Sequence, residues 1–248
     1  MLFFKRKETF VFNNGDNTVY TETSKFSRST VNVDGNQNTI HILENGINDT
    51  NVNVCGNSNN ISIEHITLDK SKISIKGNHN TVTIGKDCSM NNLEIYIHGD
   101  NHQLVIGEAV EVYGGLSLWF EDYDNKIIIG NYTTFGFTKF AIAEPNTEIT
   151  IGRDCMFANG VTVKNSDFHS IIDLNSNRRI NPAGNIIIGN HVWFGENSHI
   201  LKNVTIQDNS IVALGSIVTK NIPSNCVVAG SPGKVIKEHV TWARPRTF

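Results

Sequence analysis

Apolar and polar residues alternate in short runs through the first half of the chain, and each run follows a Gly-Asn or Gly-Asp corner. The glycines of four such units are spaced 21, 21 and 22 residues apart. Gly and Asn tolerate the positive φ that a tight corner requires, and the alternation that follows predicts a short strand. A helix is excluded because Thr, Val, Ile and Asn at period two oppose a 3.6-residue pattern. The four units are VDGNQNTIHI (33–42), VCGNSNNISI (54–63), IKGNHNTVTI (75–84) and IHGDNHQLVI (97–106).

The second half of the chain repeats every six residues. A large apolar residue recurs at each sixth position, and a mostly small residue follows it four positions later. This pattern is typical of a flat triangular coil in which three sixes make one turn of 18 residues, stacked at about 4.8 Å. We therefore predict an all-β protein, a single-stranded parallel β-helix. The large positions are Ile188, Phe194, Ile200, Ile206, Val212 and Val218, and the small ones are Val192, Ser198, Val204, Ser210, Ser216 and Ile222.

The two repeat types divide the chain into regions. We expect Asn- and Gly-rich coils over residues 1–110 and six-residue repeats over 111–233, interrupted by an extruded loop over 164–185. A short cap over 234–248 is expected to cover the sheet edge that an open β-helix exposes. The asparagines are predicted to stack in ladders that satisfy polar groups of the turns. Cys88 and Cys155 occupy small inward positions, which predicts a packing role.

Composition excludes several classes of partner. The chain has 248 residues and a net charge of −3, so no basic field draws it to nucleic acid or anionic lipid. No apolar run approaches the length of a membrane span, and the first residues lack the apolar core of a signal peptide. The four cysteines show neither CxxC pairing nor metal-ligand spacing with histidine. We expect a cytoplasmic protein with reduced thiols and no metal.

Residues 186–238 resemble the C-terminal signature of the hexapeptide-repeat acetyltransferases. The specific part is GSIVTKNIP followed by VVAGSPGKVIK, and the resemblance covers roughly 127–238. It is greatest to the capsule polysialic acid O-acetyltransferases and to the galactoside, maltose and xenobiotic acetyltransferases. This resemblance implies a left-handed helix, a homotrimer, and acetyl-CoA bound as co-substrate in a cleft between neighbouring subunits.

His169 is the candidate general base. Acetyl transfer from a thioester to a sugar hydroxyl needs a base, because the hydroxyl is a poor nucleophile, and histidine titrates in the working range. His169 lies in NSDFHSIID, at the mouth of the long break in the six-residue pattern. In the family the catalytic histidine precedes the tryptophan of IGNxVW by about two dozen residues, and His169 and Trp193 are 24 apart. Asp167 and Asp173 flank the histidine, and either is a candidate to orient its ring.

The thioester site is predicted around Trp193. Counting in sixes points Phe194 inward and Trp193 outward, toward a subunit interface or the thioester pocket. The resemblance places Trp193 beside the thiol end of CoA as a catalytic residue. Direct transfer is expected, because no cysteine or serine is paired with the histidine. The resemblance implies CoA contacts at Leu214, Gly215, Ser216 and Thr219 along the pantetheine arm and at Lys220, Lys234 and Lys237 on the phosphates.

The acceptor is inferred from three positions. Galactoside-type members carry an asparagine in the coil before the histidine, where this chain has Thr138, which disfavours a small neutral galactoside. In the loop, Arg178 and Arg179 form a pair suited to carboxylates. Together with SDFHSIID, which resembles the sialic-acid capsule enzymes, these residues favour a capsular polysaccharide that contains sialic acid. Association with a capsule-synthesis complex at the inner membrane would follow.

Other interpretations stay open from the sequence. The acceptor could be a lipopolysaccharide sugar, an amino sugar or an antibiotic. The chain could also be a non-catalytic β-helix that binds glycans. A metalloenzyme like the γ-class carbonic anhydrases needs three converging histidines, and the histidine spacing here does not show them. The N-terminal coils could lengthen a groove for a polymer, act as a spacer, or serve as a platform for partner enzymes.

Overall fold

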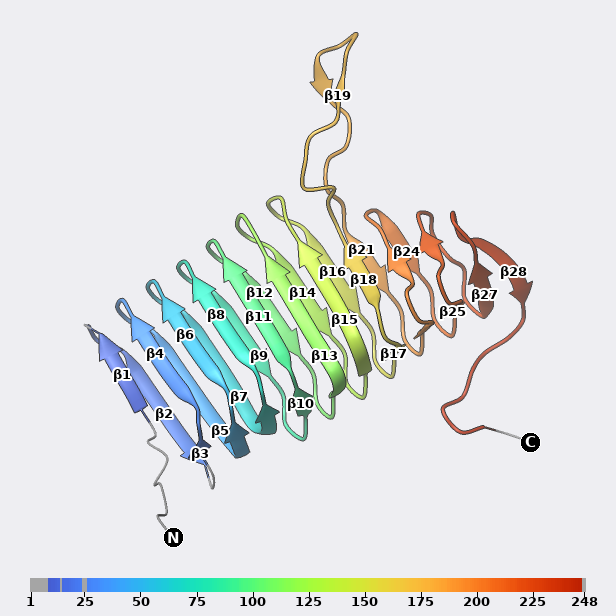
Figure 1. The fold of residues 1–248 in the computed structure, drawn as a ribbon. Helices are drawn as coiled ribbons and strands as arrows, with labels where there is room; N and C mark the ends of the chain where they lie inside the picture. The colour runs from blue at the N-terminus through green and yellow to red at the C-terminus, as the bar shows by residue number, and fades with distance from the viewer. Residues whose placement is uncertain (1–8, 14, 24–25, 247–248) are drawn as a thin grey trace.

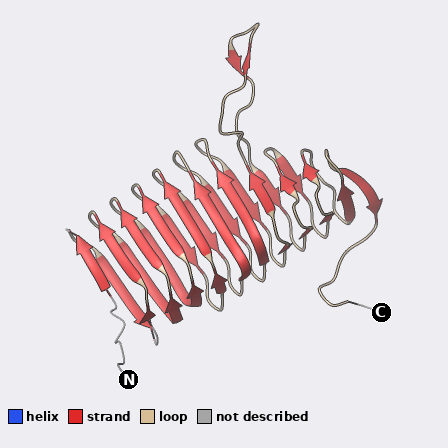
Figure 2. Ribbon diagram, viewed as in Figure 1, coloured by secondary structure: helices blue, strands red, loops and turns tan. Residues whose placement is uncertain are grey.

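The computed structural model describes residues 9–13, 15–23 and 26–246, and these ranges contain strands and loops but no helix (Figure 2). Twenty-six strands form one continuous sheet that winds into a parallel β-helix (Figure 1). The prediction of an all-β parallel helix is confirmed. The strands before residue 110 are β1 (Thr9–Asn13), β2 (Thr18–Thr23), β3 (Phe26–Ser27), β4 (Thr30–Asp34), β5 (Thr39–Asn48), β6 (Asn51–Cys55), β7 (Asn60–Asp69), β8 (Lys72–Lys76), β9 (Thr81–Ile84), β10 (Ser89–Asn91), β11 (Leu93–His98) and β12 (Gln103–Ile106).

The remaining strands continue the helix and include one small hairpin outside it. The central strands are β13 (Glu111–Phe120), β14 (Lys126–Ile129), β15 (Thr134–Ile142), β16 (Glu148–Ile151), β17 (Met156–Phe157) and β18 (Val161–Lys164). The hairpin consists of β19 (Ile172–Asp173) and β20 (Arg178–Arg179). The last strands are β21 (Ile186–Ile188), β22 (Trp193–Phe194), β23 (His199–Ile200), β24 (Val204–Ile206), β25 (Ile211–Val212), β26 (Ile217–Val218), β27 (Cys226–Ala229) and β28 (Lys234–Glu238).

Coil length changes along the helix as the two repeat types require. In the N-terminal coils Val52 pairs with Ile73, 21 residues on. In the C-terminal coils Ile188 pairs with Ile206, 18 residues on, which confirms the predicted turn of three sixes. The longer N-terminal coils accommodate the Gly-Asn corners. The shorter coils have strands of only two or three residues on each side.

The C-terminal coils form three walls of a triangular prism. The first wall consists of β16, β21 and β24. The second consists of β17, β22, β25 and β27. The third consists of β18, β23 and β26. The third wall extends toward the N-terminus through the second halves of β15 and β13 to β11 and β8.

The interior is apolar and close-packed, with rings stacked from coil to coil. Phe157 stacks on Phe135 with ring centroids 4.8 Å apart and on Phe194 at 4.4 Å. All six large positions of the six-residue repeat are buried, as predicted. Cys88 and Cys155 are buried too, and burial raises their thiol pKa values to about 11 and about 12. Both thiols therefore stay protonated and act as packing groups.

The asparagine ladders predicted from the sequence are present. The side chain of Asn59 donates from Nδ2 to Oδ1 of Asn38 at 3.0 Å, and Asn80 donates in the same way to Asn59 at 3.1 Å. The Asn59 side chain also donates to the carbonyl of Gly77 at 2.9 Å. These buried amides thus satisfy the polar groups of the turns, and burial in the prism removes them from contact with a ligand.

The C-terminal segment covers the edge of the last coil and then runs back along the helix. Strand β28 pairs antiparallel with β27. Beyond it, Trp242 is buried, stacks on His191 at a centroid distance of 4.2 Å, and donates from Nε1 to the His191 carbonyl at 2.8 Å. Arg244 donates to Asp154 at 3.0 Å and to Thr134 at 3.0 Å. The segment therefore caps the helix and also fastens itself to earlier coils.

Candidate active site

The loop that carries His169 leaves the helix at one corner of the prism. Val163 of β18 pairs with Ile200, 37 residues on, whereas Ile200 pairs with Val218, 18 residues on. The additional residues form a projection from the corner between the third and first walls, with the antiparallel hairpin β19–β20 near its tip (Figure 1). The predicted extrusion of this loop is confirmed.

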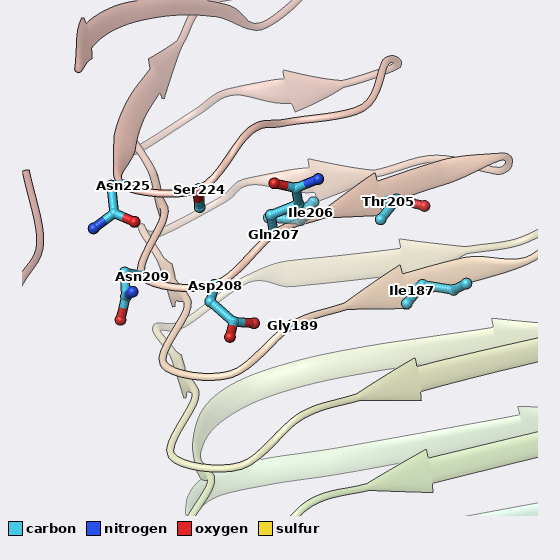
Figure 3. A pocket seen from close by; sticks show the side chains of 9 residues that line it. All are labelled: Ile187, Gly189, Thr205, Ile206, Gln207, Asp208, Asn209, Ser224 and Asn225. Atoms are coloured by element: carbon cyan, nitrogen blue, oxygen red, sulfur yellow. The ribbon is translucent and has the colours of Figure 1, made fainter. Parts of the chain in front are cut away.

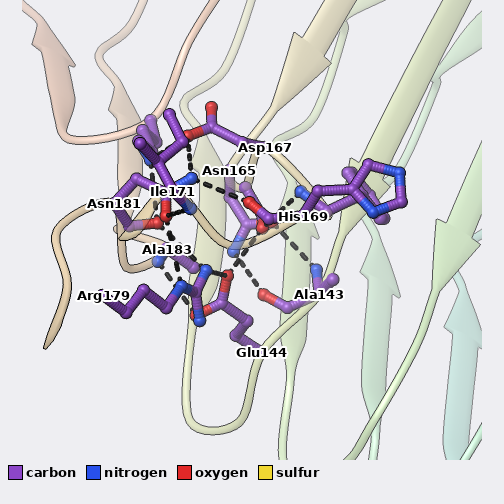
Figure 4. Close-up of polar contacts among 12 residues, drawn as sticks. Ala143, Glu144, Asn165, Asp167, His169, Ile171, Arg179, Asn181 and Ala183 are labelled. Atoms are coloured by element: carbon purple, nitrogen blue, oxygen red, sulfur yellow. Dashed lines mark hydrogen bonds and ion pairs between the residues drawn. The ribbon is translucent and has the colours of Figure 1, made fainter. Parts of the chain in front are cut away.

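The Asn181 side chain holds the two sides of this loop together at its base (Figure 4). Its Nδ2 donates to Oδ2 of Asp167 at 2.7 Å and to the carbonyl of His169 at 2.8 Å. Its Oδ1 accepts from the backbone N–H of Ile171 at 2.7 Å and from Nε of Arg179 at 3.3 Å. One buried amide therefore fixes the backbone on both sides of His169.

Two ion pairs surround this amide. Arg179 binds Glu144 through two nitrogens, at 2.8 and 2.5 Å, and Ser166 donates to the same carboxylate at 2.7 Å. The hydrogen bonds from Arg179 are the main cause that lowers the pKa of Glu144 to about 2. Lys202 donates to Asp167 at 2.5 Å, and this bond is the main cause that lowers the pKa of Asp167. Both carboxylates stay charged, so the loop base is a fully ionised network.

The imidazole of His169 points away from this network, toward the side of the N-terminal coils in Figure 4. The side chain is exposed, and among the described residues its ring makes no hydrogen bond. Asp167 is engaged by Lys202 and Asn181, and Asp173 accepts from Ser176 at 2.7 Å. The expectation that one of these aspartates orients the ring is therefore not met here. The backbone of His169 is held, while its ring is free to meet an acceptor.

Trp193 lies on the second wall beside an apolar pocket. Its side chain is 37% exposed while that of Phe194 is buried, which confirms the inward and outward assignment of this pair. The pocket, about 530 Å³ in volume, is lined by Trp193, Leu214, Ala158 and aliphatic residues of β25 and β27. The structure thus brings together two residues expected to act on acetyl-CoA. The backbone N–H of Trp193 donates to the Ser210 carbonyl at 3.0 Å, so its indole N–H is the available donor.

The other residues implied for CoA are divided between two parts of the prism. Lys237 pairs with Val227, which lines the pocket, and Lys234 pairs with Ala229, so both lysines run beside the second wall. Gly215 has a positive φ of 68° and Ser216 is completely buried, its hydroxyl accepting from Gly230 N–H at 3.2 Å. Ser216 thus supports the turn rather than presenting its hydroxyl.

Thr219 and Lys220 follow β26 and are exposed at the corner from which the loop projects. Their wall is the third, not the second, so they lie on the same corner as His169. Because the second wall is opposite this corner, one chain does not bring His169 and Trp193 together. The predicted site residues therefore form two half-sites on one molecule.

The three residues expected to contact the acceptor differ in their surroundings. Arg178 is exposed on β20, and Arg179 is engaged by Glu144. Thr138 is completely buried and its hydroxyl has no hydrogen-bond partner among the described residues. It shares an inward orientation with Phe140, because alternate residues of β15 point into the prism. This burial weighs against Thr138 as an acceptor contact, although the two arginines remain candidates.

A second hollow lies on the first wall and contains none of these residues. Figure 3 shows its lining, which includes Ile187, Thr205, Gln207 and Asp208, around a volume of about 560 Å³. Its one charged side chain is an aspartate, which is unsuited to phosphate. Within the described residues, no cluster of three or more His, Cys, Asp or Glu side chains is arranged to hold a metal ion. Those residues also contain no helix long and apolar enough to cross a membrane.

Several residues of the site were not predicted from the sequence. Glu144, Asn181 and Lys202 together fix the loop, yet Glu144 precedes Arg179 by 35 residues and Lys202 follows Asp167 by 35. Such contacts depend on how the loop folds back over neighbouring coils. The one local signal was that Asn181 lies between the arginine pair and Pro182, in a segment that must re-enter the helix.

Comparison with known proteins gives consistent relatives, although no family model matches the chain. A polysialic acid O-acetyltransferase of Neisseria meningitidis is 38% identical over 162 residues, covering 65% of this chain and 74% of that protein. One from Escherichia coli O1:K1 / APEC is 42% identical over 120 residues, covering 48% of this chain but only 39% of that protein. The crystal structure of the polysialic acid O-acetyltransferase OatWY matches with a TM-score of 0.65 and 30% identity, covering 98% of this chain and 93% of that one.

Proposed function

Because this chain belongs to the hexapeptide-repeat O-acetyltransferases, acyltransferases whose co-substrate is acetyl-CoA, we propose that it acetylates a hydroxyl of a capsular polysaccharide containing sialic acid. The observation that carries the proposal is the extruded loop, whose base fixes the backbone of His169 and leaves its ring exposed. The names of the relatives support polysialic acid as the acceptor. The exposed Arg178 on the same loop supplies a cation for its carboxylates.

In the proposed reaction, His169 removes the proton from the acceptor hydroxyl as the oxygen attacks the acetyl carbonyl. The carbon–sulfur bond of the thioester then breaks, and CoA leaves as the thiol. The indole N–H of Trp193 is the proposed donor to the oxyanion that develops on the carbonyl. Cys155 and Cys88 do not carry the acetyl group, because burial keeps their thiols protonated. Transfer is therefore direct.

The complete site is proposed to form between two copies of the chain in a homotrimer. One copy would supply the corner with His169 and Lys220. Its neighbour would supply the second wall with Trp193 and Leu214, which line the pocket proposed for the CoA arm. The position of these groups on opposite parts of one prism supports this arrangement. Lys237 beside that pocket is the candidate contact for a CoA phosphate.

The test is thiol release from acetyl-CoA with polysialic acid, free sialic acid, a galactoside, a lipopolysaccharide sugar and chloramphenicol as acceptors. Turnover that depends on the sialylated polymer is the expected result. Turnover with only a neutral small acceptor would keep the enzyme class and discard the proposed substrate. Binding of polysialic acid with no turnover on any acceptor would favour a non-catalytic glycan-binding module.

A further inference from the structure

A groove on the third wall lies between the N-terminal coils and the loop that carries His169. It has a volume of about 570 Å³. In one outward column, Ser117 lies between Glu94 and Lys139, and in the next column Ala141 lies between Trp119 and Lys164. These two small residues leave a notch among large ones. Since adjacent coils are about 4.8 Å apart, Trp119 and Lys164 are separated by roughly 10 Å, enough for one sugar ring.

Aromatic side chains form one side of this groove. Trp119 is 41% exposed, and its ring lies 5.3 Å from that of Tyr96 at an angle of 37°. Phe137 is 39% exposed on the neighbouring strand. Exposed rings of this kind offer flat apolar faces with a polar edge, which suits the C–H face of a sugar ring with hydroxyls at its rim. Isolated exposed aromatics need no explanation, but three that line one hollow do.

Cations occur at the end of the groove nearest the loop. Lys139 and Lys164 both line it and are exposed. Lys139 lies over the Phe137 ring, with Nζ 5.2 Å from the centroid, which holds it at the groove. The acidic lining residue, Glu94, lies at the other end. This distribution suits a chain that carries a carboxylate on each sugar, with the acid group toward the loop.

The groove is continuous with the proposed active site. Lys164 is the last residue of β18, and the next residue, Asn165, is bound to Ala143 at the base of the loop. The His169 ring extends toward the N-terminal coils, which is the direction of the groove (Figure 4). An acceptor chain that places one hydroxyl at His169 can therefore run along the third wall.

We propose that this groove is a second subsite for an acidic polysaccharide, holding a sugar that is several units away from the one being acetylated. Trp119 stacks on the sugar ring, and Lys139 and Lys164 bind carboxylates. This inference rests on the proposed function, and it assigns the N-terminal coils the role of lengthening the acceptor groove. It explains why the wall carries aromatic and basic side chains where the earlier coils carry asparagine and serine.

The test measures binding of long polysialic acid and of a sialic acid dimer by calorimetry, without acetyl-CoA so that no turnover occurs. Trp119→Ala and Lys139→Gln are each expected to weaken binding of the polymer at least fivefold while leaving the KM for acetyl-CoA and for the dimer unchanged. Tyr113→Ala is the matched control, because Tyr113 is an exposed aromatic on β13 before the corner at Gly114. It should bind the polymer as wild type does.

Three outcomes would overturn the subsite. These are wild-type affinity for the polymer in both variants, equal affinity of the wild type for a neutral glucan, and a change of oligomeric state in Trp119→Ala by analytical ultracentrifugation. The last result would identify the groove as a contact between copies of the chain. Normal acetylation of the polymer together with any of them would discard the subsite alone. Groove-dependent binding without acetylation would discard the proposed function alone.

Discussion

Replacing Asn181 by alanine should lower turnover while leaving the β-helix folded. The substitution removes four hydrogen bonds at the base of the loop, two of them to backbone groups on either side of His169. Asn181 itself touches no reacting atom in the proposed mechanism, so it is a positioning residue. Its loss should change where His169 lies and not what His169 is.

The magnitude follows from the contacts. A typical hydrogen bond contributes about 0.5–1.5 kcal/mol net, so four bonds amount to roughly 2–4 kcal/mol of loop stability. The loop projects from the prism, and its loss leaves the stacked core untouched. A displacement of about 1 Å at a catalytic group costs on the order of 100-fold in rate. We therefore expect kcat to fall about 100-fold, with the KM for acetyl-CoA and the melting temperature nearly unchanged.

Thiol release under saturating acetyl-CoA measures this effect, and amide hydrogen exchange at Ile171 reports whether the loop base has opened. Asn175→Ala is the matched control, since Asn175 is exposed near the loop tip. That variant should keep wild-type kcat. Wild-type kcat in Asn181→Ala, or a loss of activity that only follows a lower melting temperature, would refute the positioning argument.

Three further predictions follow from burial and charge. Phe157→Ala should lower the free energy of unfolding by about 3–5 kcal/mol in urea titrations, because its stacked ring is only 2% exposed. A thiol reagent at pH 8 should modify the exposed Cys55 quickly and Cys155 only on unfolding, since burial raises the pKa of the Cys155 thiol to about 12. Hydrogen bonds from Arg179 lower the pKa of Glu144 from 4.5 to about 2, so its contribution to stability is present above pH 4.5 and is lost as pH falls toward 2. Glu144→Gln should therefore flatten the pH dependence of stability between pH 4.5 and 2, and an unchanged slope would count against the ion pair.

The sequence predicted those parts of the fold that depend on local periodicity. The six-residue count pointed Phe194 inward and Trp193 outward, and both are found so. Each coil repeats the same contacts with its neighbours, so one period determines which side chains enter the core. The same logic could have corrected the expectation for Thr138. It has the inward parity of Phe140, and alternation along one strand outweighs a position inferred from resemblance.

The parts that the sequence did not predict depend on contacts between distant segments. The Glu144–Arg179 ion pair crosses from a coil corner to an extruded loop, and Trp242 docks on His191, 51 residues away. No period relates these positions. Their partners are set by the path of irregular backbone, for which composition gives little indication. The half-sites on opposite sides of one prism likewise become visible only once the three walls are assigned.

The central claim is that His169 acts as the base in acetyl transfer to a sialylated polymer. The most direct measurement is mass spectrometry of polysialic acid after incubation with acetyl-CoA and either wild type, His169→Ala or His41→Ala, a histidine of the N-terminal coils. We predict O-acetylated polymer with wild type and His41→Ala, and at least a 100-fold lower rate with folded His169→Ala. Wild-type acetylation by His169→Ala would contradict the account.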